Sequence, residues 1–323
     1  MTLTELYTAW DAEKKRTLKP TSYSTYTVLL EKHILPRLGE KEAITGEEVE
    51  AFRQELLAAG ISPKTTADCV GILANICRYG AKQGFWPMPT WSTNRKAGSK
   101  KPEMRPLSVE EQKRLIAHIR KEPTPRNIAV YLALTTGVSS GELSTLRWQD
   151  IDLNARVLHV RGMLSSYYDF DPDTQSKHWV ASQDSATQAR HIPLASAQLT
   201  FLKAEVRKHL PENYIFSNSD KPVDVRMVRK YVAGLMRGLG IKDRQYRDLR
   251  NTFAIQCIET GCDVFTLTTL LGGSSIYHNV EQYGSFFKKE PRPAMERLME
   301  SLEEKGGLRN ANAGRKAEPS WAL

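Results

Sequence analysis

Apolar residues recur at helical spacing through the first part of the chain. Two groups each mark one face of a helix: Leu3, Leu6, Tyr7 and Trp10, then Tyr26, Leu29, Leu30 and Ile34. A capping box at Thr45 and Glu48 starts a third helix, and the Ser62-Pro63 pair starts a fourth that runs to about Gly84. The pattern therefore predicts a four-helix N-terminal domain over residues 1–92.

The second half of the chain mixes helical and strand patterns. An apolar helix should end at Gly137, and short apolar or alternating runs at Arg156–Val160 and His191–Leu194 predict strands. The polar stretch between the runs, Ser165–Ala189, is too long for a tight hairpin loop. Helical spacing dominates again from Ser196 to Glu303. We therefore expect a mainly α fold with a small β-sheet, of the α+β type, in this domain.

A basic segment separates the two halves. Residues 93–105 hold a single acid, Glu103, among the cations Arg95, Lys96, Lys100, Lys101 and Arg105. Such a segment buries little apolar surface and reads as a linker. A capping box at Ser108 and Glu111 then starts the second domain, which we place at residues 106–304. We expect the tail at 305–323 to be disordered.

Composition narrows the possible partners. The net charge of +9 and the pI near 9.3 favour a polyanionic partner, although a membrane-surface protein would fit these values equally well. No run of about 18 apolar residues and no apolar leader is present, so we expect a cytoplasmic protein without membrane contact. The cysteines lack a CxxC pair and nearby histidines, so we expect no metal and no cofactor: Cys69, Cys77, Cys257 and Cys262.

Two motif blocks resemble the tyrosine recombinases, the integrases of phages and conjugative transposons. The blocks are TTGVSSGELSTLRWQDIDL (Thr135–Leu153) and the segment from RDLRNTF to VEQY (Arg247–Tyr283). The resemblance implies an N-terminal SAM-like core-binding domain that clamps duplex DNA, and a C-terminal domain that breaks and rejoins it. It also implies that a set of cations contacts DNA phosphates; without the resemblance, the same charges would be interpreted as merely solvating their segments. These cations are Lys64, Arg78, Lys82, Arg95, Lys96, Lys100 and Lys101.

The resemblance also assigns six catalytic slots. A tyrosine attacks the phosphodiester, two arginines hold its oxygens, a lysine protonates the leaving group, and two further side chains, histidines or a tryptophan, lie near the phosphate. Tyr283 and Arg250 are retained as nucleophile and second arginine. The other four slots are altered, and the residues that stand there are Ser139 for the first arginine, Asp184 for the lysine, Arg247 for the motif histidine and Gly273 for the last histidine or tryptophan.

These changes predict weakened chemistry. Serine offers no charge to the phosphate, and one lost electrostatic donor typically costs about 10²- to 10³-fold in rate. Asp184 would add a repelling carboxylate. Lys177 could replace the lysine if the polar stretch is rearranged, whereas His278 fits a surface or capping residue better than a catalytic one. Tyr283 fits a nucleophile and a packing aromatic equally well.

Several functional classes stay open. The resemblance implies that the region from Val223 to Arg250 lies against the duplex, so we favour DNA contact over a merely solvated face for its basic residues: Arg229, Lys230, Arg244, Arg247 and Arg250. The leading interpretation is a catalytically impaired integrase homologue that binds recombination-site-like DNA as a regulator, competitor or structural partner. An active recombinase and the product of a decaying mobile element are the alternatives. The apolar stripe of Pro291–Glu303 would serve a homotetramer on DNA, a hetero-assembly with an active recombinase, or packing on its own domain.

Overall fold

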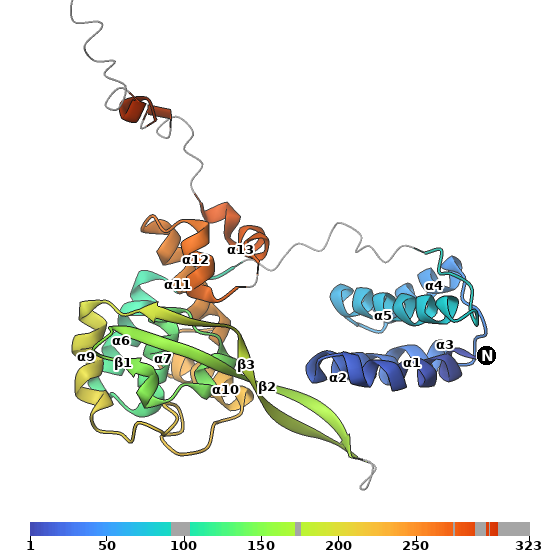
Figure 1. Cartoon of the computed structure of the whole chain (residues 1–323), viewed down its shortest axis with the longest axis horizontal. Coiled ribbons are helices and arrows are strands. Elements are labelled where there is room, and N and C mark those ends of the chain that lie inside the picture. Colours follow the sequence, from blue (N-terminus) through green and yellow to red (C-terminus); the bar gives the residue numbers. More distant parts are fainter. Residues whose placement is uncertain (92–103, 172–175, 274, 288–294, 297, 303–323) are drawn as a thin grey trace, which may run out of the picture.

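The structure is a computed structural model that describes residues 1–91, 104–171, 176–273, 275–287, 295–296 and 298–302; within 168–188 it describes the backbone alone. Figure 1 shows a helical N-terminal domain beside a larger domain that combines helices with a sheet. Each domain has its own buried apolar cluster. Among the described residues, no helix is both long and apolar enough to cross a membrane.

The N-terminal domain consists of helices around one core. They are α1 (Leu3–Thr17), α2 (Pro20–Leu29), the π-helical turn η1 (Leu30–Ile34), α3 (Leu35–Leu38), α4 (Gly46–Ala58) and α5 (Pro63–Lys82). Because α2, η1 and α3 run on without a break, the four predicted helical segments are confirmed. The Thr45 hydroxyl accepts from the Glu48 amide at 3.3 Å, while the Glu48 carboxylate accepts from the Thr45 amide at 2.8 Å. The capping box therefore starts α4 as predicted.

The C-terminal domain surrounds its sheet with helices. They are α6 (Val109–Lys121), α7 (Pro125–Thr136), α8 (Ser140–Thr145), η2 (Trp148–Asp150), α9 (Ser196–Val206), α10 (Val225–Gly238), α11 (Tyr246–Glu259), α12 (Val264–Leu271), α13 (Ile276–Tyr283) and η3 (Gly284–Phe286). The capping box at Ser108 and Glu111 starts α6, and Gly137 ends α7 in the left-handed conformation at φ +67°. Both predicted helix boundaries are confirmed.

The sheet is antiparallel with the strand order β1–β2–β3. The strands are β1 (Ile151–Asp152), β2 (Val157–Asp171) and β3 (Ser176–Pro193). Leu158 pairs with Ile192 at the inner end, Asp171 pairs with Ser176 at the outer end, and a bulge interrupts the register between Val160 and Gly162. The two predicted strands are confirmed, but their expected lengths were wrong, because the polar stretch between the runs itself forms most of both strands.

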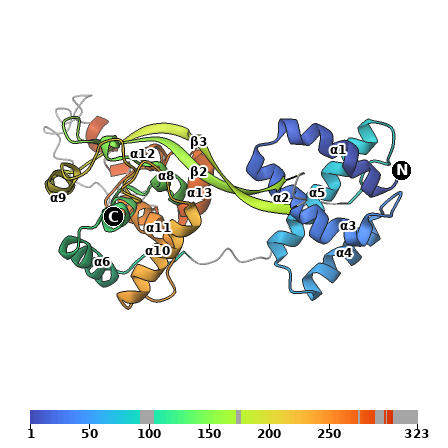
Figure 2. The ribbon, with the colours of Figure 1, turned by 90° about the horizontal axis from the view of Figure 1, so that it is seen from below.

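The physical reason for this error is composition. The stretch is rich in aromatic and β-branched residues such as Tyr167, Trp179 and Val180, which favour strands, but it lacks the alternation produced by a buried face. Figures 1 and 2 show the hairpin leaving the body of its domain. It reaches the N-terminal domain, where β2 contacts α2.

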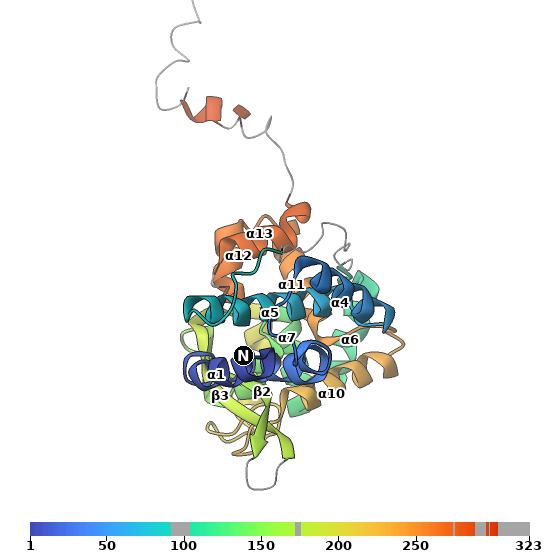
Figure 3. The same cartoon turned by 90° about the vertical axis from the view of Figure 1, so that its right-hand side faces the viewer.

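The last helices form a separate packing unit. Figure 3 shows α11, α12 and α13 gathered on one side of the C-terminal domain. Their buried side chains are Ala254, Ile255, Ile258, Leu267, Leu271 and Tyr283. Close packing of this kind fixes the orientation of each helix, so α11 presents its first turns to the start of α8.

Candidate functional site

An open pocket of about 590 Å³ lies where the starts of α8 and α11 meet α10. Its lining consists of Ser139, Ser140, Arg229, Lys230, Ala233, Gln245, Tyr246, Arg247 and Arg250. The pocket thus brings together three of the predicted slots, Ser139, Arg247 and Arg250, from distant parts of the sequence. Its lining includes four cations and, among the described residues, no acid. An anion is the ligand that such a surface attracts.

Ser139 has a structural task in this pocket. Its hydroxyl accepts from the Glu142 amide at 3.3 Å, and the Glu142 carboxylate accepts from the Ser139 amide at 2.7 Å. This reciprocal pair is the capping box of α8, which the sequence SSGE specifies. The residue in the first-arginine slot therefore starts the helix and brings no charge to the pocket.

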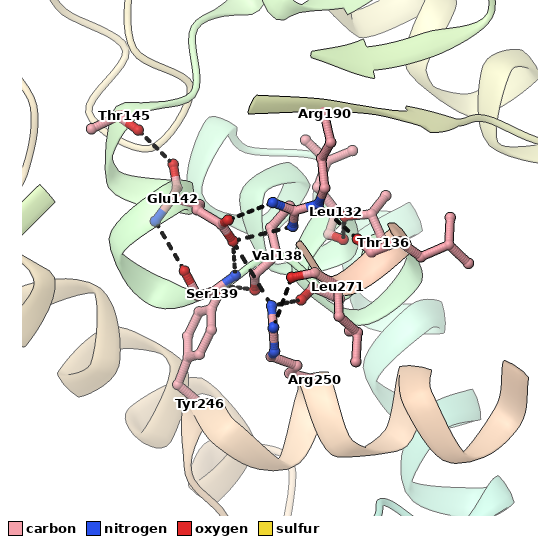
Figure 4. Close-up of polar contacts among 12 residues, drawn as sticks. Leu132, Thr136, Val138, Ser139, Glu142, Thr145, Arg190, Tyr246, Arg250 and Leu271 are labelled. Atoms are coloured by element: carbon pink, nitrogen blue, oxygen red, sulfur yellow. Dashed lines mark hydrogen bonds and ion pairs between the residues drawn. The ribbon is translucent and has the colours of Figure 1, made fainter. Parts of the chain in front are cut away.

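Glu142 is the buried acid behind the pocket. It is 8% exposed and accepts from both terminal nitrogens of Arg190, at 2.6 and 3.3 Å. Nη1 of Arg250 lies 3.8 Å from the same carboxylate, as Figure 4 shows. Burial opposes the charged form, but the hydrogen bonds and charge of Arg190, the Ser139 amide and the charge of Arg250 together outweigh it, so the pKa of Glu142 is lowered.

Arg250 joins the ends of two helices. It donates from Nη1 to the Gly137 carbonyl at 2.7 Å and from Nη2 to the Leu271 carbonyl at 2.9 Å. These carbonyls lie at the C-terminal ends of α7 and α12, where the helix leaves acceptors unpaired. The side chain stays 25% exposed and lines the pocket. Burial lowers the pKa of Arg250, and the negative charge of Glu142 opposes this shift.

Tyr283 lies outside the lining of the pocket. It is 1% exposed, its hydroxyl donates to Oδ1 of Asn251 at 3.2 Å, and Nε2 of Gln282 donates to that hydroxyl at 3.0 Å. Burial raises the pKa of Tyr283, while the positive charges of Arg250 and Arg247 act in the opposite direction. The retained tyrosine is thus a buried hydrogen-bonded side chain of the last core cluster in this state of the protein.

The remaining slots lie apart from the pocket. Gly273 lines a second cavity of about 550 Å³ between β3, α12 and α13. The backbone of Asp184 pairs with Met163 near the inner half of the hairpin, but its side chain is outside the described part. Lys177 pairs with Phe170 at the outer end, seven residues from Asp184. At roughly 3.3 Å per strand residue the two backbones are about 23 Å apart, so replacement by Lys177 would require a new hairpin register.

The predicted DNA contacts have varied surroundings. On α5, Lys64 forms an ion pair with Asp68 at 2.6 Å, Arg78 donates to Asn75 at 2.7 Å, and Lys82 is exposed. Arg244 is engaged within the protein: it donates to the Glu111 carboxylate at 3.0 Å and to a backbone carbonyl at 2.9 Å. The linker cations Arg95, Lys96, Lys100 and Lys101 lie outside the described residues.

Sequence reasoning missed Arg190. It is 7% exposed and lies 48 residues from its partner Glu142, so no local spacing links the two. Its one signal in the sequence is its position two residues before Ile192 and four before Leu194, which places all three on the same face of an extended segment. The structure buries all three side chains. A cation at an inward position of a strand implies a buried counter-charge.

The chain thus has a helical domain followed by a mixed domain whose basic pocket lies where the two motif blocks meet, the arrangement expected of an integrase. The chain belongs to the phage integrase family: residues 105–290 match the Phage integrase family, and residues 2–57 match the phage integrase N-terminal SAM-like domain.

Individual relatives agree with this assignment. The chain is 24% identical over 280 residues to a tyrosine recombinase XerC-like protein of Caldanaerobacter subterraneus subsp. tengcongensis, covering 78% of this chain and 70% of the relative. The Tn1549 transposon integrase bound to transposon right-end DNA has the same fold, with a TM-score of 0.72, 18% identity, and coverage of 94% of this chain and 99% of that one. A lambda integrase tetramer bound to a Holliday junction gives a TM-score of 0.61 at 18% identity, with coverage of 90% and 79%.

Proposed function

We propose that this protein binds recombination-site-like duplex DNA and has an impaired ability to cut it. The observation that carries the proposal is the pocket itself. It keeps four cations that suit a backbone phosphate, yet the side chain in its first-arginine slot is a helix-capping serine. Binding is served by the charges that remain, whereas transition-state stabilisation loses a donor.

The surroundings of Tyr283 also support retained DNA binding with impaired cutting. A phenol becomes a competent nucleophile when a base takes its proton or when its pKa is lowered. Here the hydroxyl donates to Asn251, whose amide oxygen is a poor base, and burial raises the pKa of Tyr283. A buried side chain must also move before it reaches a phosphate in the pocket.

The DNA would lie between the two domains. Exposed cations of α5, the basic linker and the pocket on the C-terminal domain would contact successive phosphates. Transposon right-end DNA is also what the Tn1549 integrase holds in the structure that this chain resembles. In this role the protein acts as a regulator, competitor or structural partner of an active recombinase in a bacterial cytoplasm.

Assembly on DNA is part of the proposal. Phe265 on α12 and Tyr277 on α13 are 65% and 77% exposed. The apolar residues described in the C-terminal segment are also about half exposed: Met295, Leu298, Met299 and Leu302. In this proposal these exposed apolar side chains serve as a contact with another protein chain. A tetramer, as named for lambda integrase, or a hetero-assembly would cover them.

The alternative function is an active site-specific recombinase. It is favoured by Arg250, which is held rigidly at the pocket, and by the charges of Arg250 and Arg247, which act to lower the pKa of Tyr283. In that case DNA binding would move α13 and release the tyrosine.

DNA binding is tested by fluorescence anisotropy with a duplex from the ends of the genetic element that carries the gene, and with a scrambled duplex. We expect the wild type to prefer the first duplex. In Arg247→Ala, the slope of log K against log salt concentration should become shallower by about 0.9, as for one lost phosphate contact. The control Lys121→Ala, at the end of α6 and outside the pocket, keeps the slope. No preference and no dependence on Arg247 would contradict the proposal.

A further inference from the structure

Behind the pocket, positively charged groups outnumber the negatively charged group that they face. Two guanidinium groups, of Arg190 and Arg250, face the single carboxylate of Glu142. The separations differ, since Arg190 lies at 2.6 Å and Arg250 at 3.8 Å from the nearest carboxylate oxygen. Glu142 is therefore neutralised mainly by Arg190, and Arg250 keeps most of its charge for other partners.

The two arginines also differ in their access to the pocket. Arg190 has no part in its lining and is 7% exposed, whereas Arg250 lines it. Nε of Arg190 donates to the Leu270 carbonyl at 2.7 Å, next to the Leu271 carbonyl that accepts from Arg250. Adjacent carbonyls at the end of α12 thus hold both guanidinium groups side by side (Figure 4).

A glycine at the end of α12 leaves room for the guanidinium of Arg190. Gly272 ends α12 in the left-handed conformation, at φ +67°. A β-carbon at this position would lie 2.3 Å from Nη1 of Arg190. No other residue fits this position without displacing Arg190.

We infer that Arg190 is a positioning residue for phosphate binding: by neutralising Glu142, it prevents this acid from capturing Arg250 and so keeps the Arg250 guanidinium turned to the pocket. Without Arg190, the nearest cation to the buried carboxylate is Arg250, only 3.8 Å away. A buried unpaired charge is costly, so Arg250 would leave the Gly137 and Leu271 carbonyls and close on Glu142. The inference rests on the proposed anion-binding role of the pocket.

The experiment compares DNA affinity in Arg190→Met, Arg190→Met/Glu142→Gln and the same change in an Arg250→Ala background. Arg190→Met should weaken binding by about tenfold or more, the usual effect of losing a hydrogen bond to a charged group. The double variant should recover most of this loss, because its residue 142 no longer attracts Arg250. In the Arg250→Ala background, Arg190→Met should cost less than about twofold, because its effect acts through Arg250.

A matched control removes the cation from another buried acid. Lys208, two residues beyond α9, pairs with the buried Glu205 at 2.7 Å although its own side chain is 59% exposed. Lys208→Met therefore also removes the partner of a buried acid, but away from the pocket, and should leave DNA affinity within about twofold. All variants are compared at a temperature where their melting curves show them folded. A purely structural role for Arg190 predicts an equal loss with and without Arg250, and that result overturns the inference.

A second measurement does not depend on DNA. In a crystal structure of Arg190→Met, Arg250 should lie within hydrogen-bond distance of Glu142 and away from the Gly137 carbonyl. An unchanged Arg250 would overturn the inference even if the wild-type protein binds DNA well. Conversely, a repositioned Arg250 in a protein whose wild type binds no DNA would refute the proposed function and would leave standing only the positioning of Arg250 by Arg190.

Discussion

The hydroxyl of Tyr283 donates a hydrogen bond to the side-chain oxygen of Asn251, 3.2 Å away, inside the core of the last three helices. Asn251 directly follows Arg250 on α11, so the pocket-lining cation and the acceptor of the tyrosine are neighbours in sequence. The side chains of Arg250 and Tyr283 nevertheless lie in different surroundings. Arg250 lines an open pocket, whereas Tyr283 is buried in a closed core. This separation underlies the proposed loss of chemistry with retention of binding.

Tyr283→Phe should affect stability more than binding. Loss of one buried hydrogen bond costs about 1 kcal/mol, and Asn251 keeps only the longer contact to Gln282 at 3.4 Å. Urea unfolding measures the first effect. DNA affinity, measured by anisotropy, should change by less than about twofold because a hydroxyl outside the pocket contacts no phosphate. A large loss of affinity would place Tyr283 at the DNA.

Ser139→Arg should exchange stability for affinity. Loss of the N-cap costs about 1 kcal/mol. A fifth cation at the pocket should make the slope of log K for DNA against log salt concentration steeper by about 0.9. Ser108→Arg provides the matched control, since it removes the similar capping box of α6 and adds the same charge outside the pocket. Equal slopes for the two variants would show that position 139 does not face phosphate.

Glu142 should contribute stability only above acidic pH. Its folded-state pKa is lowered from the usual 4.5, so its stabilisation is fully present above that value and is lost as the pH falls through the folded-state pKa. Glu142→Gln should lower the unfolding free energy by about 3 kcal/mol at pH 7, because Arg190 is left buried and unpaired. In urea titrations the difference between the two proteins should shrink towards pH 3. A difference independent of pH would refute the lowered pKa.

Gly272→Ala should be more harmful than an equivalent change at an open site. Both Gly272 and Gly60 have positive φ, +67° and +77°, but a β-carbon meets Arg190 at 2.3 Å only at Gly272. Backbone strain alone costs about 1 kcal/mol, as expected for Gly60→Ala, and the steric clash adds roughly 1 to 3 kcal/mol at Gly272. Urea unfolding of the two variants compares these costs. Equal losses would mean that Arg190 adapts freely.

Local rules predicted much of this fold. Capping boxes at Thr45 and Ser108 gave correct helix starts because the bonds that form them lie within three residues. The outer part of the β2–β3 hairpin was missed because its sequence does not alternate between apolar and polar residues, which is the pattern that predicts a strand.

The site was only partly accessible to the same rules. Arg250 and Ser139 lie in recognisable motifs, and the structure brings both to one pocket. The pairing of Arg190 with Glu142 spans 48 residues and depends on how the β2–β3 hairpin docks on α8 through β2, and no local pattern encodes such a contact. What surrounds Tyr283 likewise depends on the packing of α13 against α11.

The most direct test of the central claim uses a duplex with a nick near its cleavage position, which traps a covalent protein–DNA adduct when a tyrosine attacks. We predict a salt-sensitive complex with this duplex and no adduct that survives denaturation, because the Tyr283 hydroxyl donates to the weakly basic amide oxygen of Asn251 and a helix-capping serine stands in the first-arginine slot. An adduct that forms with the wild type and disappears in Tyr283→Phe would contradict the account and establish an active recombinase.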